Sequence, residues 1–83
     1  MARYYFRVLK GSRSVIEDPD GSDLPDLQAA HAEAVSAIRE MLAEALRWGR
    51  EPVGHSLVIA DSQGQQLEIV RFVDILPKTL IRH

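Results

Sequence analysis

The stretch DLQAAHAEAVSAIREMLAEALRW, from Asp26 to Trp48, decides the fold because its apolar residues recur with the period of an α-helix. At 100° per residue these residues share one side of the helix, and most charged residues lie opposite. Asp26 offers a carboxylate that can cap the first turn, and Gly49 is a natural stop signal. An N-cap at Ser22 or Asp23 is the alternative and would start the helix one turn earlier.

Both flanks of this helix are typical of β-hairpins. On the N-terminal side, Arg3 to Leu9 is rich in aromatic and β-branched residues, and Ser14 to Glu17 forms a short return strand. On the C-terminal side, Ser56 to Ala60 and Gln65 to Val73 form the second pair of strands. The predicted fold class is α+β in the order ββαββ, with a single helix packed on one face of a small antiparallel sheet. The strand order stays open, because this connectivity allows either outer pairing.

The second hairpin allows two registers. If Gly64 is the left-handed residue of a three-residue, bulged loop, Ile59 faces Leu67 and Leu57 faces Ile69. A four-residue loop would instead move each partner by one residue and set polar side chains against apolar ones. We favour the first register because it keeps apolar residues together on one face.

The favoured register leaves the second face of the sheet partly apolar. Tyr5, Val58, Val70 and Phe72 then point away from the helix, and contiguous apolar area of this kind usually marks an interface. These four residues form the candidate interface, and we expect a homodimer that associates through the sheet or the tail. A bulge near Val70 and Arg71 is the alternative, and it would return Phe72 to the core.

Length and composition place limits on the class of protein. The 83 residues, with 46% hydrophobic and 27% charged, predict one globular domain over residues 1–83, in which residues 73–83 form a docked turn or a loosely docked tail. The absence of cysteine excludes disulfides and thiolate metal sites. The sequence has no apolar run near the ~18 residues of a membrane span and no signal-peptide pattern, so we expect a cytoplasmic protein without membrane contact.

Acidic and histidine residues suggest metal binding only superficially. In a calcium loop that starts at Asp18, glycine reaches the fourth position instead of the sixth, and the twelfth is Ala29. Turn formation and helix capping explain the acids between Glu17 and Asp26 without a metal. His31 lies on the apolar side of the helix, where we expect a partly buried ring that is hydrogen-bonded to the sheet; a pH-dependent role is the alternative. We therefore predict no metal site.

Residues for catalysis are missing as well. The chain has no cysteine nucleophile, no serine in a GxSxG elbow and no glycine-rich phosphate loop. A pocket of a few hundred Å³ is also hard to build from so small a core. We therefore predict no enzyme, no catalytic residues and no cofactor. The favoured function is a non-enzymatic protein-interaction or regulatory module that self-associates and has an unidentified protein partner.

The alternative function is an antitoxin-like or single-strand nucleic-acid-binding protein. Arg3, Tyr5 and Arg7 place an aromatic ring between two cations on the outer side of the first strand, as in sheet-based RNA binders. A net charge of −2 offers no long-range attraction for phosphate and disfavours this alternative.

The chain resembles a family of short, uncharacterised bacterial proteins of unknown function. The resemblance covers nearly the whole chain and implies a small, stand-alone α+β protein of the bacterial cytoplasm, with no established activity or site residues. Glu68 and Arg71 depart from the family pattern, in which an apolar residue and a proline are common. A looser likeness in element order links the chain to HicB-type antitoxins and implies no function. The matching features are Arg3-Tyr4-Tyr5-Phe6, Asp18-Pro19-Asp20-Gly21, Leu24-Pro25-Asp26-Leu27, the Ala/Glu-rich helix, Ala60-Asp61 with Gly64, and Phe72 with Asp74.

Overall fold

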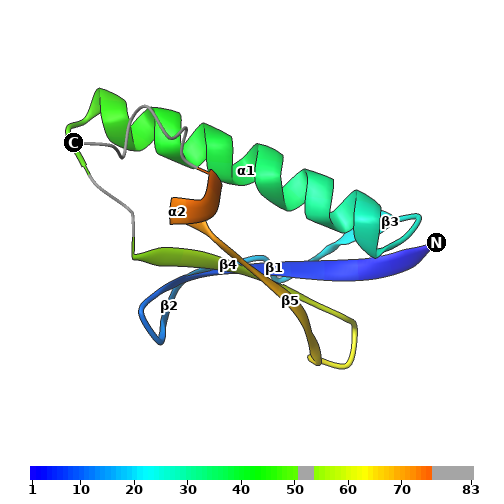
Figure 1. Ribbon diagram of the computed structural model, residues 1–83. Helices are drawn as coiled ribbons and strands as arrows, with labels where there is room; N and C mark the ends of the chain where they lie inside the picture. The colour runs from blue at the N-terminus through cyan, green and yellow to red at the C-terminus, as the bar shows by residue number, and fades with distance from the viewer. Residues whose placement is uncertain (51–53, 76–83) are drawn as a thin grey trace.

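The computed structural model describes residues 1–50 and 54–75, which form one antiparallel sheet with a long helix across one face (Figure 1). This arrangement confirms the predicted α+β class. The strands lie in the order β2-β1-β4-β5, and the unpredicted strand β3 pairs with the beginning of β1. In chain order the elements are β1 (Ala2–Lys10), β2 (Arg13–Glu17), β3 (Ser22–Leu24), α1 (Leu27–Arg47), β4 (His55–Ala60), β5 (Gln66–Arg71) and α2 (Phe72–Ile75).

Helix α1 begins and ends where local capping chemistry predicts. The Asp26 carboxylate accepts a hydrogen bond of 2.8 Å from the backbone N–H of Ala29, which confirms Asp26 as the N-cap. At the other end Gly49 adopts a positive φ of 69°. The N–H of Arg50 then donates to the carbonyl of Ala45 at 2.7 Å, which closes the helix in a Schellman motif.

The core lies between α1 and the sheet. In the N-terminal half of α1 the fully buried positions are Ala30 and Ala34, and further along the larger Ile38 and Leu42 are buried, followed by Ala45 near the end of the helix. Small side chains let a helix approach a sheet closely, and larger ones hold it further away. Accordingly, α1 rises away from the sheet toward its C-terminal end (Figure 1). The sheet and α2 contribute Tyr4, Val8, Leu57, Ile59, Val70 and Phe72 to this core.

The register of the second hairpin differs from the prediction. The loop closes as predicted, because the N–H of Asp61 donates to the carbonyl of Gln65 at 3.0 Å and Gly64 has a φ of 81°. One strand position further, however, the pairing shifts, so that Ile59 faces Glu68 instead of Leu67. The cause is a β-bulge that adds one residue to β5, and a one-residue shift exchanges the two faces of a strand.

This shift makes the predicted outward direction of Val70 and Phe72 wrong. Leu57 pairs with Val70 instead of Ile69, and Val70 is buried in the core. The chain then turns into α2 directly after β5, which places Phe72 against the ring of His55 at a centroid distance of 5.6 Å. The alternative prediction, a return of Phe72 to the core, is therefore confirmed, although α2 produces it. Of the predicted tail, residues 76–83 lie outside the described residues.

Candidate functional site

The outer face of the sheet, defined as the face opposite α1, holds the remaining candidates for an interface. Leu57 and Ile59 point into the core, so Val58 between them lies on the outer face. Val58 is nevertheless fully buried, because its cross-strand neighbours Arg7 and Ile69 flank it with larger side chains. Ile69 itself is 47% exposed. The exposed apolar surface of the outer face is therefore centred on Ile69, which belongs to β5, the last strand of the sheet.

The four predicted interface residues separate into two groups. Tyr5 lies on the outer face, where it pairs with Ala60 of β4, and Val58 lies on the same face. Val70 and Phe72 belong to the core on the other side of the sheet. Sequence reasoning missed Ile69, since the predicted register had placed it against the helix. No local signal in the sequence identifies the bulge that exposes it.

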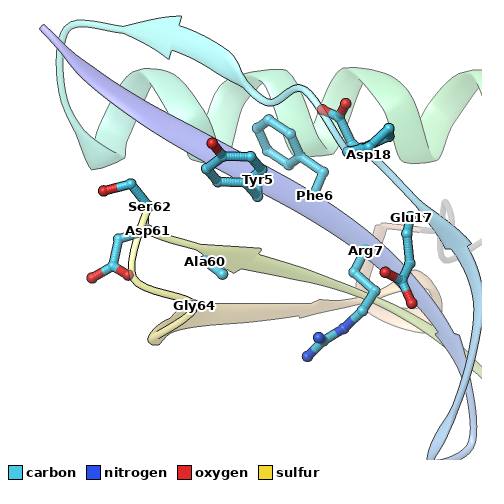
Figure 2. Close-up of a pocket in the computed structure, with 10 residues that line it drawn as sticks. Tyr5, Phe6, Arg7, Glu17, Asp18, Ala60, Asp61, Ser62 and Gly64 are labelled. Atoms are coloured by element: carbon cyan, nitrogen blue, oxygen red, sulfur yellow. The ribbon is translucent and has the colours of Figure 1, made fainter.

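An open hollow of about 290 Å³ lies at one end of the outer face (Figure 2). The sequence predicts that such a volume is hard to build, yet the bend of the chain after β2 and the β4–β5 loop enclose it. Arg7 and Glu17 extend side by side into this region from β1 and β2. Tyr5 and the loop around Asp61 complete the walls.

The carboxylates around this hollow are engaged in holding turns. Asp18 accepts hydrogen bonds from the backbone N–H groups of Asp20 and Gly21, at 3.3 and 3.2 Å. Asp61 accepts two from its own loop, both at 2.9 Å. Glu17 accepts a hydrogen bond of 3.0 Å from the Ser14 hydroxyl. These acids therefore stabilise the local turns and the β2 strand through hydrogen bonds. Within residues 1–50 and 54–75, no three metal-ligating side chains come together.

The predicted nucleic-acid surface on β1, formed by Arg3, Tyr5 and Arg7, lies close to acidic residues of the same chain. Arg3 forms an ion pair with Asp23 at 3.2 Å and also donates to the carbonyl of Asp20. Arg7 lies opposite Glu17 in the sheet register. The Asp23 carboxylate neutralises Arg3, and a neutralised cation contributes little to phosphate attraction.

His31 connects α1 to the last strand of the sheet. Its Nδ1 lies 2.9 Å from Oε2 of Glu68, and the two side chains are 46% and 33% exposed. This contact confirms the prediction of a partly buried histidine that is hydrogen-bonded to the sheet. It also explains how Glu68 is tolerated on the helix-facing side of β5, because the bulge brings its carboxylate within reach of the imidazole.

These features define a class: a small α+β domain with an open antiparallel sheet, one long helix and, within the part of the chain that the structure describes, the edge strand β5, which is paired on one side. A family model matches residues 3–73, and the chain belongs to that family, described as Domain of unknown function (DUF6894). This match confirms the resemblance to a family of unknown function. No curated protein and no solved structure matches the chain. Among the described residues, neither helix is long and apolar enough to cross a membrane.

Proposed function

We propose that this protein is a non-enzymatic protein-interaction module that forms a homodimer through the free edge of β5. The observation that supports the proposal is the exposure of Ile69, 47%, on a strand that has a neighbour on one side only among the described strands. An edge strand presents unpaired backbone N–H and C=O groups, and exposed apolar side chains on such a strand favour pairing with another chain. A regulatory role would then depend on the surface that the dimer presents to a second protein.

The side chains of β5 favour one register for this pairing. In an antiparallel pair of identical strands related by a two-fold axis, two residues that face each other must have their side chains on the same face of the sheet. Side chains alternate between the faces along a strand, so the numbers of two facing residues must add up to an even number. A pair centred on Glu68 would set two like charges opposite each other, which is unfavourable. A pair centred on Ile69 sets two isoleucines together on the outer face, and Glu68 then faces Val70 of the second copy.

The charges of β5 are compatible with this pairing. Glu68 already contacts His31, and the Arg71 guanidinium forms two hydrogen bonds of 3.1 Å to the Asp74 carboxylate. Both charged side chains of the strand therefore have a hydrogen-bonded partner within their own chain. The nucleic-acid alternative gains no comparable support, because Arg3 is paired with Asp23.

The test is the solution mass by light scattering over a range of protein concentrations. We expect the native chain to give twice its mass of 9.3 kDa and Ile69→Lys to give a folded monomer. Val15→Lys is the matched control, because Val15 is equally exposed, at 46%, but lies in β2 at the opposite edge. A dimer that survives Ile69→Lys, or a native chain that stays monomeric throughout, would contradict the proposal. Circular dichroism of each variant establishes that it is folded.

A further inference from the structure

A second and larger hollow, of about 580 Å³, lies on the helix-facing side of the sheet. It lies near the β1–β2 hairpin, where α1 has risen away from the sheet (Figure 1). Helix α2 contacts both α1 and β4 and so fills part of this space. Met41 of α1 and Phe72 of α2 line the part that stays open. The volume is within the range of small-molecule sites in proteins, about 300–1,000 Å³.

The inner wall of this hollow is apolar. Val8 and Phe72, which are 3% and 1% exposed, form its floor as part of the core. Ile16 pairs with Val8 across β1 and β2 and extends the apolar surface outward, where it is 55% exposed. A hydrocarbon chain or an aromatic ring that lay along these residues would remove the exposed part of Ile16 from water. Burial of that kind is favourable at about 25 cal/mol per Å².

Cationic and imidazole side chains surround the apolar floor. Lys10 and His55 face each other across β1 and β4, and Arg50 follows the end of α1. Within residues 1–50 and 54–75 the lining contains no carboxylate, and neither Lys10 nor Arg50 takes part in an ion pair. The described side chains around this hollow therefore carry a net positive charge, in a chain whose net charge is −2.

His55 adds an unsatisfied polar atom to the same wall. Its Nδ1 is buried and has no hydrogen-bond partner among residues 1–50 and 54–75, and its ring packs against Phe72. A buried polar atom without a partner is destabilising and is rare in folded proteins. Such an atom beside a hollow of this size is an independent sign that a polar group belongs there.

We propose that this hollow binds a small amphiphilic carboxylate. The apolar part of the ligand lies along Val8, Ile16 and Phe72, and its carboxylate lies between Lys10 and Arg50. Charge complementarity supports this occupant, because the two charged side chains in the described lining, Lys10 and Arg50, are both cationic. The site is separate from β5, so the result does not depend on whether the chain forms a dimer.

The experiment is calorimetric titration of the full chain with dodecanoate below its micelle concentration, in parallel with dodecyltrimethylammonium. The two probes have the same hydrocarbon chain and opposite charge. We expect one dodecanoate to bind per chain, at least about tenfold tighter than the cation, since a charge-assisted hydrogen bond contributes about 1.5–3 kcal/mol and 1.4 kcal/mol is tenfold in Kd. Equal affinities for the two probes, or no binding of dodecanoate, would overturn the proposal.

Two charge-reversal variants, one at the hollow and one at a distant site, distinguish binding in the hollow from nonspecific attraction of dodecanoate to the positive charges of the chain. Arg50→Glu should weaken dodecanoate binding at least about tenfold, by loss of one charge-assisted contact. Arg39→Glu makes the same change on the exposed side of α1 and should leave the affinity within about twofold. If Arg50→Glu does not fold, the milder Lys10→Gln takes its place. Equal effects of Arg50→Glu and Arg39→Glu would refute the site.

Amide chemical shifts locate the ligand independently of its affinity. Dodecanoate should shift the signals of Ile16, Met41 and His55, which line the hollow, and leave Leu67 and Ile69 of β5 unchanged. Shifts confined to β5 would place the amphiphile on the proposed dimer edge and would refute binding in the hollow.

Discussion

Truncation of Phe72 tests the arrangement of the C-terminal part of the fold most directly. Phe72 is 1% exposed, packs against the ring of His55 and joins α2 to the core. Phe→Ala substitutions in cores cost about 3–5 kcal/mol, because the lost burial is accompanied by a cavity. A domain of 83 residues has a total stability of about 4–12 kcal/mol at 0.05–0.15 kcal/mol per residue. Phe72→Ala should therefore remove a large share of the folding free energy.

The assay is thermal unfolding followed by circular dichroism, with urea unfolding at 25 °C as a second measure. For a domain of this size, 1 kcal/mol corresponds to about 4–8 °C in Tm, so we expect Phe72→Ala to lower Tm by roughly 12–40 °C. The matched control is Ile16→Ala, which truncates a large apolar residue that is 55% exposed. Because Ile16 is only partly buried, this truncation should cost about 1 kcal/mol or less, near the centre of the distribution for point substitutions and well below the cost at Phe72.

The opposite result would restore the interpretation that the sequence first favoured. If Phe72 pointed away from α1, its truncation would leave Tm within a few degrees of the native value and would change only the solution mass. Equal losses for Phe72→Ala and Ile16→Ala would therefore refute the placement of Phe72 in the core. They would also refute the bulge in β5 and the turn into α2 from which that placement follows.

Three further substitutions test the capping and turn chemistry. Asp26→Ala removes the acceptor of the 2.8 Å hydrogen bond from Ala29 and should cost about 1 kcal/mol of unfolding free energy in urea; an unchanged midpoint would show that the cap contributes nothing. Gly21→Ala and Gly49→Ala each place a side chain at a positive φ, 73° and 69°, and this backbone strain should cost about 1 kcal/mol in each variant. At position 21 the new Cβ would also lie 2.9 Å from the Tyr4 carbonyl oxygen, so Gly21→Ala should lose more stability than Gly49→Ala. Equal losses in urea unfolding would contradict this close approach.

The helix could be predicted from the sequence because its determinants are local. The apolar period, the carboxylate of Asp26 and the αL position of Gly49 all act within a few residues of the chain. The predicted limits, Asp26 and Trp48, are the two caps of α1. The loop at Asp61 could be predicted for the same reason, since its hydrogen bonds close within five residues.

The parts that sequence reasoning missed depend on contacts between distant residues. Strand β3 has three residues and no period of its own, and it is held by pairing with β1 and by the ion pair of Arg3 with Asp23. The extra residue in β5 brings Glu68 to His31, 37 positions earlier in the chain, and turns Val70 into the core. A simple alternation rule favours apolar pairs and cannot include a polar contact with the helix. For this reason it selected the wrong face for β5.

The corrected register also decides which edge of the sheet is suited to association. Val70 and Phe72 are in the core, so the outer face loses two of the four residues predicted for an interface. This loss favours association through an edge of the sheet over packing face to face. At the β2 edge, pairing with β1 is irregular between Val8 and Leu9, and a bulge of this kind discourages further pairing. In β5 the irregularity lies at the loop end, so the stretch from Glu68 to Arg71 is regularly paired on one side. A regular strand with Ile69 at its centre is the better template for a second copy.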